Sequence, residues 1–253
     1  MYRGVRRDTG EDVVIKKCQV SELWNRGGRT APLRFLVNEI DFQYGLSNHP
    51  QAATILSAGL SNVPDSGEVY VLMTPADGDL SSVDMAGDKR KLMELVWEIA
   101  SVLEVSHSRG IVHRDIKPAN ILLYGDSFCL ADFGVSEKQD KISATLGTKR
   151  YLPSPQFDPH QTTQTDIAML GVTLYEKFYG VQPPVSAFEG FADITAIRDE
   201  LVEDTFVNRL ILACVVENPE LRLTAREVMT MVSDEYSREL MESMKAQLVH
   251  GFL

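Results

Sequence analysis

Basic residues are scarce in this chain compared with acidic ones. Its 253 residues contain 25 lysines and arginines against 36 aspartates and glutamates, which gives a formal net charge of −11 at pH 7. A surface that binds nucleic acid and a polybasic membrane anchor both need an excess of positive charge. The composition therefore argues against nucleic acid and against a membrane surface as partners.

Cysteine is also rare, and long apolar runs are missing. The three cysteines, Cys18, Cys129 and Cys214, are odd in number and too widely spaced to pair as metal ligands. We expect all three to be buried as small apolar side chains in a reducing compartment, the cytoplasm or the nucleus. The N-terminus has no apolar signal-peptide core, and no run of about 18 apolar residues occurs, so neither secretion nor membrane spanning is predicted.

What remains is the composition of an ordinary globular protein. Apolar residues make up 44% of the chain and charged residues 24%, as is usual for soluble domains. Internal repeats and low-complexity tracts are absent from the sequence. The length is sufficient for one large domain or for two lobes around a cleft.

Two short motifs in the middle of the chain carry its clearest chemical signal. The first, H-R-D-I-K-P-A-N from His113 to Asn120, places a carboxylate, an ammonium and an amide close together. The second, D-F-G, begins at Asp132 after a short β-rich stretch. Alone, the first would indicate a surface ion pair and the second a turn. Together they suit a site that holds a divalent metal ion and phosphate beside a hydroxyl that must lose a proton.

The two motifs resemble the catalytic loop and the metal-binding turn of eukaryotic-type protein kinases, H-R-D-x-K-x-x-N and D-F-G. The resemblance implies an α+β, bilobal fold in a single domain over residues 1–253. A small β-rich lobe would span 1–73, a hinge 74–79 and a larger, mainly helical lobe 80–253. The implied activity is transfer of the γ-phosphoryl group of ATP to protein serine or threonine, with Mg²⁺ as cofactor.

The resemblance also implies a role for each polar residue of the two motifs. Asp115 would accept or orient the proton of the attacking hydroxyl, and Lys117 would neutralise charge that develops on the γ-phosphoryl group. Asn120 and Asp132 would give oxygen ligands to Mg²⁺. A lysine two residues after the aspartate is the pattern of serine/threonine kinases.

Upstream of these motifs, the resemblance implies a nucleotide site. Lys16, at the end of a β-branched run, resembles the strand lysine that grips the α- and β-phosphates, and Glu39 resembles its partner on a helix. Asp79 falls where many kinases contact the ribose, although a helix N-cap explains it equally well. The other implied nucleotide contacts are the gatekeeper Met73, the backbone of Ala76, and the side chains of Leu122 and Asp132.

The chain departs from the kinase pattern near its N-terminus. No glycine-rich loop, G-x-G-x-x-G, precedes the first expected strand, so the backbone amides that would cover the β- and γ-phosphates are missing. A truncated sequence and a degenerate kinase both remain open. Gln43 takes a position that is usually apolar in active kinases. A pseudokinase that binds partners or nucleotide without turnover is therefore the alternative to an active enzyme.

The stretch from Val135 to Arg150 resembles the activation segment of the family. Arg114 is of the kind that binds a phosphate on that segment, which makes Ser143 and Thr145 candidate targets of an activating kinase. The simpler explanation is that serine and threonine are common in loops. A regulatory partner is implied only by the resemblance.

The A-P-E signal that should follow is broken, because neither Pro155 nor Gln156 carries a carboxylate. Arg222 resembles the arginine that normally pairs with that glutamate, so we expect it to lack its usual ion partner. Gln156 would then accept a weaker hydrogen bond from Arg222. Asp166 resembles the residue that holds the backbone of the catalytic loop.

Overall fold

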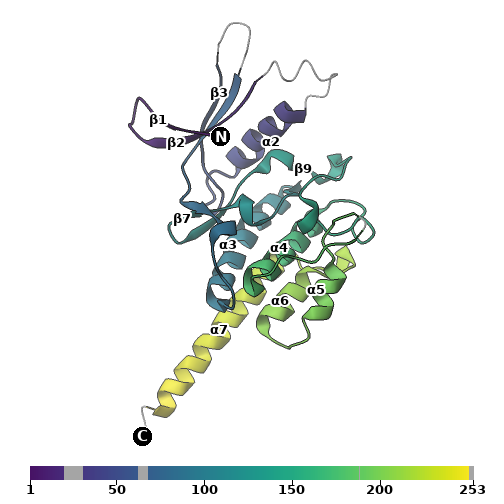
Figure 1. The fold of residues 1–253 in the computed structure, drawn as a ribbon. Coiled ribbons are helices and arrows are strands. Elements are labelled where there is room, and N and C mark those ends of the chain that lie inside the picture. The colour runs from purple at the N-terminus through teal and green to yellow at the C-terminus, as the bar shows by residue number, and fades with distance from the viewer. Residues whose placement is uncertain (20–30, 62–67, 188, 251–253) are drawn as a thin grey trace.

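The computed structural model describes residues 1–19, 31–61, 68–187 and 189–250. A small sheet with one helix lies at one end of the molecule and a larger helical body at the other (Figure 1). The sheet is antiparallel in the order β1-β2-β4-β3. Its strands are β1 (Tyr2–Val5), β2 (Asp12–Gln19), β3 (Ile55–Ser61) and β4 (Glu68–Met73).

Helix α2 (Ala31–Gly45) lies against this sheet (Figure 1). The contact is apolar: Leu36 of the helix is buried against Ile55, Val69 and Val71 of the strands. Alternation along β4 puts Val69 and Val71 on the same face of the sheet. This packing fixes α2 beside β2, which is what brings Glu39 and Lys16 together.

The helical body is built around α3 (Lys89–Ser108). Asp88 caps its N-terminus by accepting a hydrogen bond from the Lys91 amide. The apolar positions of α3 recur every three or four residues, as a helix with one buried face requires. Val105 is partly buried, and the other apolar positions of this face are fully buried: Leu92, Leu95, Val96, Ile99 and Leu103.

Four further helices complete the described helical body. They are α4 (Thr163–Tyr179), α5 (Ile194–Glu200), α6 (Phe206–Cys214) and α7 (Ala225–His250). Helices α4 and α7 pack on α3, and α5 and α6 pack on α4. At Gly171, α4 approaches α6 so closely that a Cβ atom there would lie 2.7 Å from Cβ of Cys214. Helix α7 runs along α3 and then extends beyond the body, as its yellow end in Figure 1 shows.

Short strands and 3₁₀ turns connect the longer elements. The strands form the sheets β5-β7-β8 and β6-β9, and they are β5 (Gly78–Asp79), β6 (Ile111–Val112), β7 (Ile121–Tyr124), β8 (Ser127–Leu130) and β9 (Glu137–Lys138). The 3₁₀ turns are η1 (Leu80–Ser82), η2 (Pro118–Asn120), η3 (Phe133–Val135), η4 (Gln139–Lys141), η5 (Lys149–Tyr151) and η6 (Pro219–Leu221). Both sequence motifs thus lie on turns at strand ends.

Two of the three cysteines can be compared with their predicted burial. Cys129 and Cys214 are buried free thiols, as expected. Burial raises the pKa of the Cys129 thiol to about 11 and that of Cys214 to about 12, so both are poor nucleophiles at neutral pH. The side chain of Cys18 lies outside the described part of the structure.

Arg222 lacks the usual glutamate partner but pairs with a different carboxylate, so the expected hydrogen bond to Gln156 is wrong. Its Nη1 atom lies 2.7 Å from Oδ2 of Asp158, and both side chains are almost completely buried. Gln156, the expected substitute, is exposed instead. The expected substitute lay at positions 155 and 156, next to the broken A-P-E signal. A buried guanidinium requires a compensating carboxylate, and the following loop supplies one two residues beyond Gln156.

Removing this carboxylate should destabilise the helical body strongly. We expect Asp158→Ala to lower the free energy of unfolding by about 3–5 kcal/mol, because Arg222 would stay buried without its counter-charge. Urea denaturation followed by circular dichroism measures the change. Asp204→Ala is the matched control, because Asp204 pairs with Arg209 on the surface and exposed ion pairs contribute little. Equal denaturation midpoints for the two variants would contradict this account.

Candidate active site

One cavity of about 240 Å³ lies where the small sheet, the connection after β4 and the catalytic loop meet. Lys16 reaches it from β2, Glu39 from α2, and Asp132 from the turn after β8. The structure brings together all eight residues predicted for nucleotide or metal binding. They are Lys16, Glu39, Met73, Ala76, Asp79, Asn120, Leu122 and Asp132.

Lys16 joins two carboxylates from opposite sides of this cavity. Its Nζ atom lies 2.6 Å from Oε2 of Glu39 and 3.1 Å from Oδ1 of Asp132. Burial alone would lower the pKa of Lys16, but the charges of Glu39 and Asp132 outweigh burial and raise it. Lys16 therefore stays protonated at neutral pH and presents a fixed positive charge to the cavity.

Asp115 is the centre of a second cluster, next to the cavity. Its Oδ1 accepts hydrogen bonds from the Thr148 amide at 2.8 Å and the Thr148 hydroxyl at 2.6 Å. Its Oδ2 accepts from Lys117 Nζ at 2.7 Å and Asn120 Nδ2 at 2.8 Å. Lys117 also donates to the Thr148 hydroxyl at 2.7 Å. The two predicted catalytic residues thus contact one another, and Asn120 connects them to the cavity.

The pKa of Asp115 reflects these donors. Burial pushes the pKa upward, but the hydrogen bonds from Lys117 and Thr148 outweigh burial and hold it below its usual value. Asp115 is therefore an ionised acceptor at neutral pH. A carboxylate of lowered pKa is a weak base, so its main effect is to orient a hydroxyl group, and it takes up a proton only late in a reaction.

The backbone on the N-terminal side of Asp115 is held by Asp166, at the start of α4. The amides of His113 and Arg114 each donate to the Asp166 carboxylate at 2.8 Å, and His107 contacts it at 2.9 Å. Arg114 has a φ of 69°, which is strained for a residue with a side chain. The buried carboxylate holds this strained turn in place, and so fixes the direction of Asp115.

The D-F-G turn is held in a comparable way. Phe133 is buried against the His113 ring, with ring centroids 4.6 Å apart in an edge-to-face arrangement. Asp132 adopts a left-handed conformation with φ of 62°. The buried aromatic ring anchors the turn, and the positive φ turns the Asp132 carboxylate toward Lys16.

Some cavity residues were not predicted. Tyr124 lines the cavity, and its hydroxyl donates to the Thr74 carbonyl at 3.2 Å. Asp79 lines the cavity and caps η1 by accepting a hydrogen bond from the Ser81 amide, so the N-cap is confirmed and the ribose contact stays a prediction. The pairing of β5 with β7 sets Asp79 opposite Leu122 and Gly78 opposite Leu123, and no sequence pattern revealed that pairing. The remaining residues that line the cavity are Met1, Val14, Thr74, Gly78, Ala119 and Ala131.

Gln43 lies in α2, one turn beyond Glu39. It is completely buried, and its Nε2 atom donates to the Ala53 carbonyl at 2.7 Å. Its Oε1 atom has no partner in the described structure. The amide therefore ties α2 to the chain before β3 at the cost of one unsatisfied acceptor.

The donor set suits Mg²⁺ shared with a phosphate group. Asp132 offers a carboxylate that is 47% exposed, and both described hydrogen bonds of Asn120 use Nδ2, which leaves Oδ1 for a metal ion. Within the described residues, no three His, Cys, Asp or Glu side chains cluster to hold a metal by themselves. Mg²⁺ commonly takes only one or two protein ligands and completes its shell with phosphate and water.

The family is decided by comparison with known proteins. Residues 1–232 match the model of the protein kinase domain. The chain belongs to the protein kinase domain family. Its small antiparallel sheet and helical body are the two lobes that the sequence implied.

Bacterial enzymes are among the relatives of this kinase domain. It is 29% identical over 210 residues to the serine/threonine-protein kinase PknB of Mycolicibacterium smegmatis and 30% identical over 207 residues to a probable serine/threonine-protein kinase of Clostridium acetobutylicum. Each match covers 72% of this chain and 32% of the relative. The chain thus spans about a third of the length of these relatives. No helix among the described residues is long and apolar enough to cross a membrane.

Gly147 offers a test of how closely the segment before Thr148 must approach the catalytic loop. With φ of 119°, it packs so tightly that an added Cβ atom would overlap the carbonyl oxygen of Arg114. We expect Gly147→Ala to separate Thr148 from Asp115 and to lower kcat of any phosphoryl transfer at least about tenfold, a loss of about 1.4 kcal/mol.

Gly87→Ala is the control for Gly147→Ala. Gly87 also has a positive φ, of 72°, but a Cβ atom there would meet nothing within 4 Å. The Gly87→Ala variant should lose only about 1–2 kcal/mol of stability from backbone strain, and its kcat should be unchanged. Steady-state kinetics and thermal unfolding measure the two effects. Unchanged kcat in Gly147→Ala would contradict the close packing.

Proposed function

We propose that this kinase domain transfers the γ-phosphoryl group of ATP to serine or threonine hydroxyls of proteins. The observation that carries the proposal is the contact between Asp115, Lys117 and Thr148 beside a cavity lined by Lys16 and Asp132. Asp115 is an oriented proton acceptor, Lys117 is a fixed cation beside it, and Lys16 is a cation that can bind phosphate. Phosphoryl transfer needs groups of these kinds from a protein.

In the proposed reaction, the hydroxyl oxygen of the substrate attacks the γ-phosphorus of ATP. A new oxygen–phosphorus bond forms as the bond from the γ-phosphorus to the β,γ-bridging oxygen breaks, and ADP leaves. Asp115 orients the hydroxyl and takes its proton, while Lys117 offsets the negative charge on the transferred group. Thr148 holds both residues at the distances described above.

The nucleotide would occupy the 240 Å³ cavity. Lys16, kept charged by Glu39, would bind the α- and β-phosphates, and Asp79 would contact the ribose. Met73, Leu122 and the backbone of Ala76 would surround the adenine. Bound Mg²⁺, held by Asn120 and Asp132, would neutralise the phosphate charge during transfer.

The finer features of substrate and regulation are also proposals. Arg114 donates to the backbone carbonyl of Ala144 at 3.3 Å, and the neighbouring Ser143 and Thr145 are exposed. This arrangement supports the two hydroxyls as targets of an activating kinase. Cytoplasm or nucleus remains the predicted compartment.

The direct test is transfer of radiolabelled γ-phosphate from ATP with Mg²⁺ to a generic basic protein. We expect Asp115→Asn to reduce kcat by about 10²–10⁴, the usual contribution of a positioned proton acceptor. Asp126→Asn is the matched control, because it makes the same change on an exposed turn between β7 and β8. Its activity should equal that of the unaltered chain.

Two results would contradict the proposed activity. Equal transfer by the unaltered chain and by Asp115→Asn would mean that the phosphate comes from another enzyme or another site. No transfer by either, with ATP binding retained in a titration, would establish the pseudokinase alternative. An extended protein that includes any upstream glycine-rich segment of the gene should be assayed alongside, because that loop would add backbone amides over the phosphates.

A further inference from the structure

Gln161 makes an unusual contact with the segment that leads to Thr148. It lies in the loop before α4 and is only 4% exposed. Its Oε1 atom accepts a hydrogen bond from the Leu146 amide at 3.0 Å, and its Nε2 atom donates to the Leu146 carbonyl at 2.6 Å. One side-chain amide therefore satisfies both backbone groups of Leu146, as a neighbouring β-strand would do.

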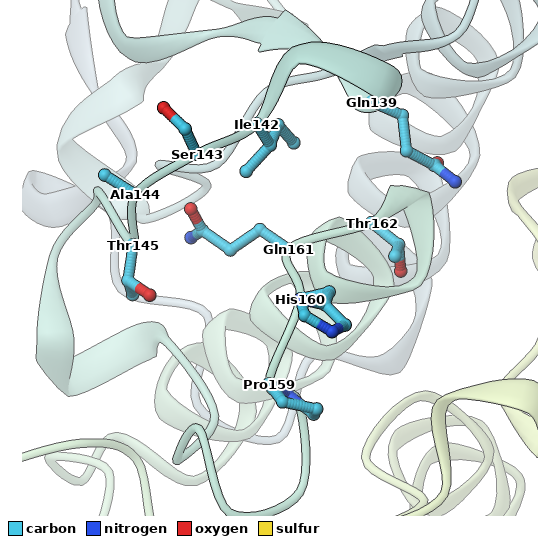
Figure 2. Close-up of a pocket in the computed structure, with 9 residues that line it drawn as sticks. All are labelled: Gln139, Ile142, Ser143, Ala144, Thr145, Pro159, His160, Gln161 and Thr162. Atoms are coloured by element: carbon cyan, nitrogen blue, oxygen red, sulfur yellow. The ribbon is translucent and has the colours of Figure 1, made fainter.

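The surroundings of Gln161 show why this contact matters. Figure 2 shows its side chain reaching from the loop before α4 toward the segment of Ile142, Ser143, Ala144 and Thr145. A hollow of about 500 Å³ lies between that segment and residues 159–162. The segment therefore borders open space on this side. The Gln161 amide spans the gap.

The contact leads directly to the catalytic cluster. Leu146 is followed by Gly147, which packs tightly on the Arg114 carbonyl, and then by Thr148, whose amide and hydroxyl both donate to Asp115. Only Gly147 separates Leu146 from Thr148, so fixing the backbone at Leu146 leaves Thr148 little room to move. A displacement of Leu146 would therefore move the donors that orient Asp115, and hydrogen bonds weaken steeply as their geometry degrades.

We propose that Gln161 is a positioning residue for phosphoryl transfer: its amide fixes Leu146 so that Thr148 holds Asp115 and Lys117. The proposal rests on the kinase activity proposed above. Gln161 does not touch the nucleotide cavity, so it acts on the turnover number and leaves the affinity for ATP unaltered. A side chain that replaces Gln161 without loss of the contact must offer Leu146 both a hydrogen-bond donor and an acceptor.

Gln161→Glu separates the two halves of the contact with almost no change of shape. One carboxylate oxygen can still accept from the Leu146 amide. The other faces the Leu146 carbonyl and can bond to it only when it carries a proton. We expect kcat at pH 8 to fall about tenfold, the effect of about 1.4 kcal/mol, with KM for ATP unchanged. Lowering the pH to about 6 should restore most of the loss, because burial and the facing carbonyl favour the protonated acid.

Gln156→Glu is the control, because Gln156 is an exposed glutamine of the same loop and the charge change is identical. The quantity to compare is kcat of Gln161→Glu divided by kcat of Gln156→Glu at each pH. This ratio cancels the pH effects of the other titratable and charged groups near this region, which both variants share: Asp115, Arg114, Glu137, Lys141, Asp158, His160 and Arg222. A ratio that falls from near one at pH 6 to about one tenth at pH 8 supports the proposal.

The ratio remaining at one across this range would overturn the proposal. A lower melting temperature with unchanged kcat would also overturn it, because that outcome means a purely structural role. If the unaltered chain transfers no phosphate, the proposed function fails, and amide hydrogen exchange decides the positioning separately. Faster exchange at Leu146 and Thr148 in Gln161→Glu at pH 8 than in Gln156→Glu supports it, and equal protection contradicts it.

Discussion

The carboxylate of Asp166 fixes the catalytic loop, and the rest of the site depends on it. This carboxylate is fully buried, accepts hydrogen bonds from two backbone amides and contacts His107. It thereby keeps Arg114 in a strained left-handed conformation. Strain of this kind persists only when the surroundings determine it. Because Asp166 begins a long buried helix, the direction of Asp115 is set by the core of the helical lobe. A flexible loop could not hold it as well.

The second constraint is electrostatic and joins the two lobes. Lys16 from the sheet meets Glu39 from α2 and Asp132 from the helical lobe. The apolar contact between α2 and the sheet positions the first pair, and the burial of Phe133 positions the second. Each charged contact thus depends on an apolar one nearby. The cavity is lined from both lobes.

The sequence predicted the fold and which residues gather around the cavity, because both motifs require particular residues at fixed spacing. The roles of those residues stay predictions. Asp115, Lys117 and Asn120 lie within six residues, so local turn geometry nearly determines their contacts. The Asp158–Arg222 pair and the amide of Gln161 were not predicted. Both contacts join residues that are far apart in sequence, and Asp158 and Gln161 lie in an irregular loop. The periodicity of side chains does not predict contacts made from such a loop. Their partners follow from the tertiary packing of α4 against the loops around it.

The central claim is that one site holds ATP with Mg²⁺ and presents the γ-phosphate to a hydroxyl beside Asp115. The most direct measurement is a crystal structure of the chain with a non-hydrolysable ATP analogue, Mg²⁺ and a serine peptide. The account predicts the adenine against Met73 and Leu122, Mg²⁺ on Asn120 and Asp132, and the serine oxygen within hydrogen-bonding distance of Asp115. A nucleotide bound elsewhere, or a peptide hydroxyl that does not reach Asp115 while the nucleotide is in place, would contradict it.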